Sequence, residues 1–144
     1  MAQNFQNMRV WQDAVSLHKD IISKLTSLPK EELYAMNSQL RRASLSISNN
    51  IAEGCGRDSN KELRNFLNIA MGSCKEVESM IIVARELRYI TEETFTILIQ
   101  KIIVIGKKLN SLMQKISISI NQAVQVGQSP KNQQPTTKNQ QREA

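Results

Sequence analysis

The chain has 144 residues, of which 40% are hydrophobic and 4% aromatic, and its net charge is +6. This length fits a single domain. A core built from Ile, Leu, Val, Met and Ala favours helices packed on helices and argues against a β-sandwich. Residues 127–144 carry +2, so the remaining body holds about +4, a mild excess that can attract nucleic acid but is lower than many DNA-binding domains carry.

Targeting and redox signals predict a cytoplasmic protein with no membrane partner. Residues 1–7 lack the apolar run of a signal peptide. The most apolar stretch, residues 95–106, is interrupted by Gln100 and Lys101 and is too short to span a bilayer. Cys55 and Cys74 lack metal-ligand spacing, and we expect both to be reduced.

The first predicted helix covers residues 8–27, where Pro29 ends it because the residue before a proline avoids helical backbone. Ile21 and Leu28 are expected at the edge of its apolar face. The residues predicted on that face are Val10, Trp11, Ala14, Val15, Ile22 and Leu25. Residues 30–36 are predicted to form a connector.

The second predicted helix begins at Asn37 or Ser38, either of which can cap it, and ends near Gly54. Gly54 and Gly56 tolerate positive φ and are expected to stop the helix. Its apolar seam consists of Leu40, Ala43, Ile47, Ile51 and Gly54. An ordered polar stripe runs beside that seam and indicates a second, partly buried surface; it consists of Gln39, Arg42, Ser46, Asn50, Glu53 and Arg57.

The third predicted helix opens with a capping box, Ser59 followed three residues later by Glu62, and closes near residue 90. The fourth opens at Thr91 and carries an apolar seam that includes Ile103 and continues to about residue 120. We therefore predict an all-α fold, an antiparallel up-down-up-down four-helix bundle over residues 1–126 with a disordered C-terminal tail over 127–144.

Several apolar residues lie off the seams of the third and fourth helices: Ile82, Val83, Ile97, Val104 and Ile105. One bundle buries one stripe per helix, so this excess predicts oligomerisation. The candidate oligomer interface is Ile82, Val83, Ile97 and Val104.

Reaction chemistry is not indicated. His18 is the only histidine, so neither a metal site nor a di-iron bundle site is predicted. No strand precedes a glycine-rich phosphate loop, and no Ser, His and Asp are placed as a triad. We expect no enzyme activity, no metal and no cofactor.

The helix-two stripe and a comparable stripe on helix three form one candidate polar seam: Gln39, Arg42, Asn50, Glu53, Ser73 and Glu76. One interpretation is structural: an Arg42–Glu76 ion pair and an asparagine hydrogen bond fix the register between helices or protomers. The other is a small polar pocket or ligand groove, and an enzyme pocket on Arg42, Asn50 and Glu53 is the least favoured version of it.

Basic side chains supply the nucleic-acid-binding candidates: Arg41, Arg57, Lys61, Arg64, Lys101, Lys107, Lys108 and Lys115. Arg57, Lys61 and Arg64 surround a predicted helix N-terminus, where backbone N–H groups also attract phosphate. This is a footprint for RNA backbone. Few aromatic residues lie among these cations, which argues against sequence-specific stacking on single strands.

A family resemblance spans residues 5–120. Gln39-Leu40-Arg41-Arg42-Ala43 is followed by Asn50-Ile51-Ala52-Glu53-Gly54, and then by Arg57, Lys61-Glu62, Phe66-Leu67, Gly72-Ser73 and Glu76. In this pattern the chain resembles the four-helix-bundle 23S rRNA intervening sequence proteins. It departs from them at Ser48, where the family often has proline.

The resemblance implies a bundle that assembles into a ring, a homopentamer, with no enzyme activity and no cofactor. It also implies relatives encoded within insertions in large-subunit rRNA genes. A more distant similarity is to the accessory protein of diversity-generating retroelements, a basic barrel that binds a reverse transcriptase and nucleic acid. Two hypotheses follow. The first is a ring-forming protein that contacts the sugar-phosphate backbone of RNA or DNA. The second is a protein-interaction adaptor, for example for a reverse transcriptase.

Overall fold

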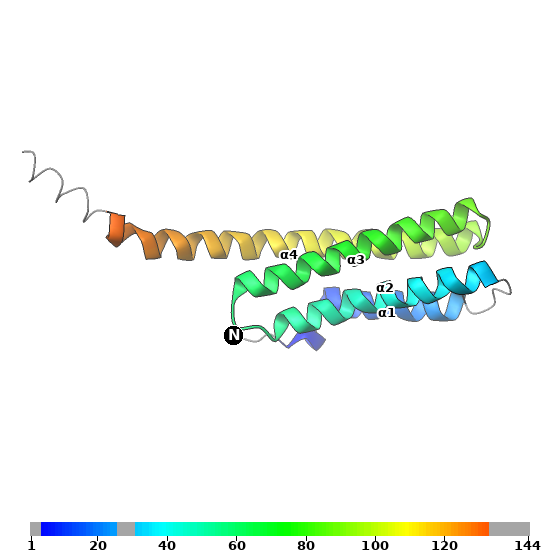
Figure 1. Ribbon diagram of the computed structural model, residues 1–144, viewed down its shortest axis with the longest axis horizontal. Helices are drawn as coiled ribbons and strands as arrows, with labels where there is room; N and C mark the ends of the chain where they lie inside the picture. Colours follow the sequence, from blue (N-terminus) through cyan, green and yellow to red (C-terminus); the bar gives the residue numbers. More distant parts are fainter. Residues whose placement is uncertain (1–3, 26–30, 133–144) are drawn as a thin grey trace, which may run out of the picture.

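The computed structural model describes residues 4–25 and 31–132, and in these ranges the regular elements are all helical. Four α-helices follow a short 3-10 turn, η1, at Phe5–Asn7. They are α1 (Arg9–Lys24), α2 (Glu31–Cys55), α3 (Asn60–Glu86) and α4 (Glu92–Asn132). Figure 1 shows consecutive helices running in opposite directions.

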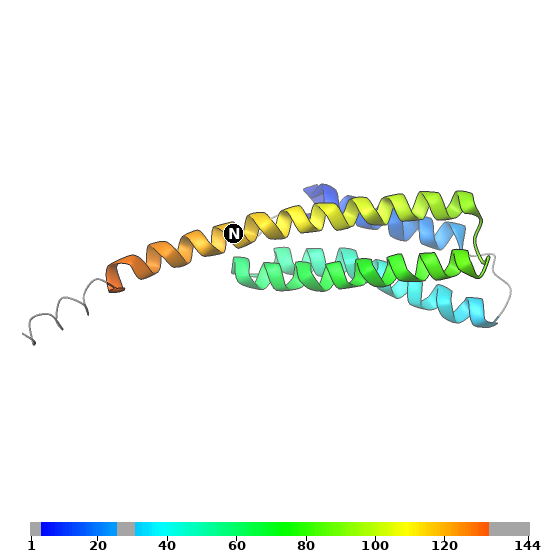
Figure 2. The same ribbon diagram turned by 90° about the horizontal axis from the view of Figure 1, so that it is seen from above.

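The four helices form a closed bundle. Each packs against the next in the chain, and α1 also packs against α4. Figures 1 and 2 show the four rods side by side, with the C-terminal part of α4 projecting beyond the end where α3 begins. The antiparallel up-down-up-down bundle predicted from the sequence is therefore confirmed.

The core is aliphatic. All four apolar residues of the α2 seam, Leu40, Ala43, Ile47 and Ile51, are buried as predicted. The buried face of α1 differs in part from the predicted one. Its residues step by four, three, four and four: Val10, Ala14, Leu17, Ile21 and Leu25. Ile22 is 36% exposed because this seam leaves it on the outer side of the helix.

Helix starts follow the predicted caps in α3 and α4 but not in α2. Ser59 Oγ accepts from the Glu62 backbone N–H at 3.2 Å, and Thr91 Oγ1 accepts from that of Thr94 at 3.1 Å. The helix α2 begins at Glu31 rather than at Asn37. The Asn37 side chain instead donates to the Leu25 carbonyl at 3.3 Å, so it serves the C-terminal end of α1.

Positive φ occurs at the end of α3 and not at the end of α2. Within the described residues, Arg88 is the only non-glycine residue with positive φ (59°), and no glycine adopts it. The prediction for Gly54 and Gly56 is thus wrong in mechanism. A Cβ on Gly54 would lie 2.9 Å from Phe66 Cβ, so this glycine is required by the close approach of α2 to α3.

The helix α4 is longer than predicted, and its buried face differs from the predicted apolar seam. It continues to Asn132, past the expected boundary at residue 126, and residues 133–144 of the predicted tail lie outside the described residues. Residues 121–127 are all exposed, so burial ends before the predicted boundary and helical backbone continues after it. Ile105, expected off the seam, is fully buried, whereas Ile103, expected on it, is 45% exposed.

Candidate functional site

Two of the eight candidate cations are paired across the α1–α4 interface. Lys101 forms an ion pair with Asp20 and also donates to Ser16 Oγ at 3.0 Å. Lys108 forms an ion pair with Asp13. Because each carboxylate neutralises its lysine at a partly buried position, these two cations contribute little to a basic surface.

The three basic residues predicted around the start of α3, Arg57, Lys61 and Arg64, do not act together. Arg57 lies 3.2 Å from Glu53 and 4.7 Å from the centroid of the Phe66 ring, so its charge is engaged locally. Arg64 Nε donates to Ser117 Oγ of α4 at 2.8 Å. Lys61 is exposed and forms no ion pair with any described residue.

Arg41 belongs to a polar contact between α1 and α2. Its backbone carbonyl accepts from Ser44 Oγ at 3.1 Å, and that hydroxyl lies 2.7 Å from His18 Nδ1. Burial, and second the neighbouring Arg41 charge, lower the pKa of His18 below 6.5. The Arg41 Nε is buried and without a hydrogen-bond partner among described residues.

The polar seam splits into a bonded centre and exposed ends. Ser46 Oγ lies 2.9 Å from Ser73 Oγ, which joins α2 to α3. Asn50 Nδ2 donates to the carbonyl and hydroxyl of Ser46, at 2.8 and 2.9 Å. The contact between the two helices is thus made by two serine hydroxyls, whereas Asn50 bonds within its own helix and does not supply the inter-helix asparagine bond of the structural interpretation.

The outer members of the seam do not join that contact. Gln39, Arg42 and Glu76 are exposed. The Arg42–Glu76 ion pair is not formed within the described chain. Glu53 pairs instead with Arg57, one helical turn later.

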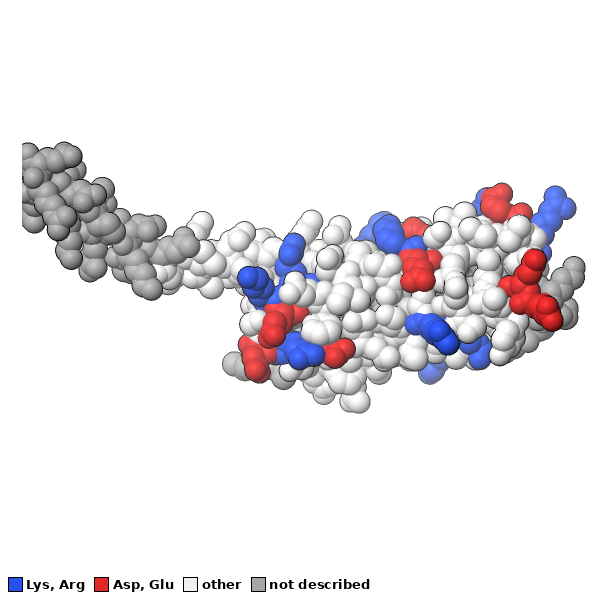
Figure 3. All heavy atoms as spheres, in the orientation of Figure 1, with Lys and Arg blue, Asp and Glu red and all other residues white. Residues whose placement is uncertain are grey.

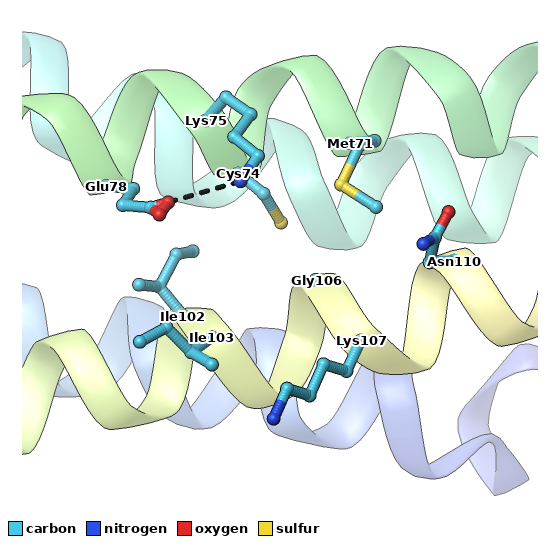
Figure 4. Close-up of a pocket in the computed structure, with 9 residues that line it drawn as sticks. All are labelled: Met71, Cys74, Lys75, Glu78, Ile102, Ile103, Gly106, Lys107 and Asn110. Carbon is cyan, nitrogen blue, oxygen red and sulfur yellow. Dashed lines mark hydrogen bonds and ion pairs between the residues drawn. The ribbon is translucent and has the colours of Figure 1, made fainter.

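A hollow of about 430 Å³ lies between α3 and α4. Figure 4 shows Cys74 and Asn110 directed into the space between the two helices, whereas Lys107 points away from α3. Lys75 and Glu78 form an ion pair at 3.3 Å on the α3 side. The complete lining is Met71, Cys74, Lys75, Glu78, Ile102, Ile103, Gly106, Lys107 and Asn110.

The hollow does not contain an activated nucleophile. Burial raises the pKa of Cys74 to about 12, so the thiol stays protonated at neutral pH. Within residues 4–25 and 31–132, no group of three or more His, Cys, Asp or Glu side chains could hold a metal ion. The same ranges contain no helix that is long and apolar enough to cross a membrane.

A second hollow of about 500 Å³ continues the α3–α4 face toward the start of α3 and shares Asn110 with the first. Its lining is Arg64, Asn68, Asn110, Met113, Gln114, Ser117 and Ile118. Sequence reasoning selected Arg64 but missed the amides. The available signal was spacing: Arg64 and Asn68, like Asn110 and Gln114, are four residues apart and so share one side of their helix.

We call four exposed apolar residues of α3 and α4 the apolar band. Ile82 and Val83 on α3 are 42% and 41% exposed, and Ile103 and Val104 on α4 are 45% and 44% exposed. Ile97 is half-buried and lines a shallow hollow of about 270 Å³ toward α1, together with Val104. Of the four predicted interface residues, Ile82 and Val83 therefore line a hollow on α3, and Ile97 and Val104 line the one between α4 and α1.

Charge on the face drawn in Figure 3 is mixed. Basic and acidic side chains alternate along the bundle, with an uncharged area between them. The cations of the candidate set that lack an acidic partner in the described part of the chain are Arg41, Lys61, Arg64, Lys107 and Lys115.

Comparisons with known proteins place the chain in a family. The family described as 23S rRNA-intervening sequence protein matches residues 6–111. A crystal structure of a protein of unknown function from the S23 ribosomal protein family of Bacteroides thetaiotaomicron is 27% identical, with a TM-score of 0.67. The match covers 72% of this chain and 97% of that one. No curated protein matches the chain. The chain therefore belongs to the 23S rRNA-intervening sequence protein family.

Proposed function

We propose that this protein is a non-enzymatic scaffold that assembles with copies of itself into a ring and binds nucleic-acid backbone as an accessory protein. The observation that carries the proposal is the apolar band of Ile82, Val83, Ile103 and Val104, all more than 40% exposed. A segment that is apolar on every side is normally buried, and residues 102–105 of α4 are four consecutive apolar residues that fit that description. We infer that further copies cover the band.

The position of the band favours a closed ring over a two-fold dimer. Ile82 lies on α3, whereas Val104 lines the groove toward α1, so the residues of the band occupy two different sides of the bundle. Contacts between unlike surfaces generate rings when the rotation closes. The family resemblance implies five subunits.

The assembly is tested by light scattering on the full chain, before and after nuclease treatment. The expected mass is five times the 16.3 kDa of one chain, and unchanged after nuclease. Ile103→Glu combined with Val104→Glu should give monomers, because a buried unpaired carboxylate opposes association.

Leu45→Glu combined with Ile69→Glu is the matched control, since these residues are 44% and 52% exposed but lie outside the band. The control should keep the wild-type mass. A monomeric wild-type protein, or equal dissociation of both variants, would contradict the assignment of the band.

Binding to the phosphates of a nucleic acid would use the lysines that form no ion pair with described residues. Lys61, Lys107 and Lys115 are exposed and form no ion pair with described residues. Substituting all three with Ala should weaken binding of any single strand and make its dependence on salt less steep, by about 0.7 in slope for each phosphate that is no longer neutralised. The control removes the same charge elsewhere: Arg9→Ala, Lys19→Ala and Lys24→Ala on α1. Equal weakening by both triples would indicate a response to net charge, not a site.

The alternative is a protein-interaction adaptor, for example for a reverse transcriptase, without direct nucleic-acid binding. It is favoured by the internal pairing of Lys101, Lys108 and Arg57, which leaves the surface less basic than the sequence suggests. Under this alternative, the wild-type chain binds no oligonucleotide at low salt but still captures its partner after nuclease treatment.

A further inference from the structure

The hollow at the start of α3 is lined by three side-chain amides that have no partner among the described residues. Asn68, Asn110 and Gln114 form no hydrogen bond with any described residue, although they line the same space of about 500 Å³. Each amide carries two N–H donors and one carbonyl acceptor. Three such groups facing one hollow can satisfy a ligand that offers donors and acceptors along a planar edge.

Arg64 is held at the rim of this hollow. Its Nε donates to Ser117 Oγ at 2.8 Å, which joins α3 to α4 and fixes the side chain. The two terminal nitrogens make no described hydrogen bond or ion pair and stay available. A guanidinium with a fixed stem and a free end suits a phosphate group, which it can bind through two parallel hydrogen bonds.

The remaining lining is apolar or neutral. Met113 is half-buried and Ile118 is 57% exposed, which provides aliphatic surface against the face of a ring. The hollow is lined by no acidic residue. Its volume of about 500 Å³ lies within the range of small-molecule sites.

We propose that this hollow binds one unpaired base of a single-stranded nucleic acid. Asn68, Asn110 and Gln114 read the edge of the base, and Arg64 holds the adjacent phosphate. Asn and Gln are the side chains that form paired hydrogen bonds with base edges, and in single strands those edges are accessible. This inference rests on the proposed nucleic-acid binding and adds to it a preference among bases, through hydrogen bonds in place of aromatic stacking.

The test measures fluorescence anisotropy with labelled 12-nucleotide strands: oligo-U, oligo-A, oligo-C and a fully abasic strand, each as ribose and deoxyribose versions. The wild-type chain should bind at least one base-bearing strand about tenfold more tightly than the abasic one, which corresponds to about 1.4 kcal/mol. Asn68→Ala combined with Gln114→Ala should reduce that ratio to below about threefold and leave the salt dependence unchanged, since neither amide neutralises a phosphate.

Asn49→Ala combined with Gln100→Ala is the control, because these residues are also exposed helical amides without a hydrogen bond to described residues. It should keep the wild-type ratio, and thermal unfolding of both variants verifies that they fold. Base preference that survives in the Asn68/Gln114 variant, or equal wild-type binding of base-bearing and abasic strands, would overturn the site while leaving backbone binding in place. Absence of any wild-type binding would overturn backbone binding as well.

Discussion

Asp20 on α1 forms an ion pair with Lys101 on α4, and seven residues further along α4, Lys108 pairs with Asp13, which lies seven residues before Asp20 on α1. The two pairs lie along one seam because seven residues complete two helical turns. They fix the antiparallel register of α1 against α4, and they remove two lysines from the surface available to an anion.

The first prediction reverses this neutralisation. Asp13→Asn combined with Asp20→Asn frees both lysines, so affinity for a single strand should rise at low salt, with a salt dependence steeper by about 0.7 for each additional phosphate that is neutralised. The free energy of unfolding should fall by about 1 kcal/mol or less per pair. Anisotropy titrations and urea unfolding measure the two effects.

A charge-matched control distinguishes freed lysines from a general change in net charge. Glu76→Gln combined with Glu93→Gln removes the same charge from exposed residues that form no described ion pair. If this control raises affinity as much as the aspartate variant does, Lys101 and Lys108 do not contact the nucleic acid even when released.

The second prediction concerns the approach of α2 to α3. Gly54→Ala places a methyl group 2.9 Å from Phe66 Cβ and 3.0 Å from Leu63 Cδ1, and the resulting overpacking should lower the free energy of unfolding by about 1–3 kcal/mol. Gly72→Ala meets nothing within 4 Å and should raise it by up to about 1 kcal/mol through helix propensity. Urea unfolding of both variants measures the difference. Equal changes in the free energy of unfolding would show that α2 and α3 move apart at Gly54 to accommodate the methyl group.

The third prediction is a pH dependence. The pKa of His18 lies below its unfolded value of 6.5 because of burial and the nearby Arg41, so the unfolded chain gains a proton first as the pH falls. The contribution of His18 to the free energy of unfolding is therefore fully present above pH 6.5, and it is lost as the pH falls toward the pKa of the folded state. Urea unfolding at pH 7.5 and 5.5 should show a larger loss in the wild-type chain than in His18→Gln, and identical losses would exclude this contribution.

The fourth prediction is that the buried thiol is inert. Burial raises the pKa of Cys74 from 9.0 to about 12, so its thiolate fraction at pH 8 is about a thousandfold below that of an ordinary cysteine. In a Cys55→Ser background, maleimide should label Cys74 only after unfolding in urea. Ser79→Cys in the same background adds an exposed thiol on α3 that should react at once, and rapid native labelling of Cys74 itself would contradict the burial.

Spacing and caps in the sequence determined much of the fold. The α2 seam, the capping box at Ser59 and the cap at Thr91 are local patterns, because each depends on residues within a turn or two of one another. The family resemblance likewise depends on order along the chain, and the match over residues 6–111 confirmed it.

The tertiary structure alone decided which side of each helix is covered and which charges remain free. Spacing alone places Ile103 in the core and Ile105 outside it. In the structure Ile105 is buried and Ile103 is exposed, because the positions of α1 and α3 around α4 determine which side of α4 is covered. The partners of Lys101 and Lys108 lie more than 80 residues away on α1, beyond any local pattern. The candidate base site is of the same kind, since Arg64 and Asn68 meet Asn110 and Gln114 only because α3 and α4 run antiparallel in contact.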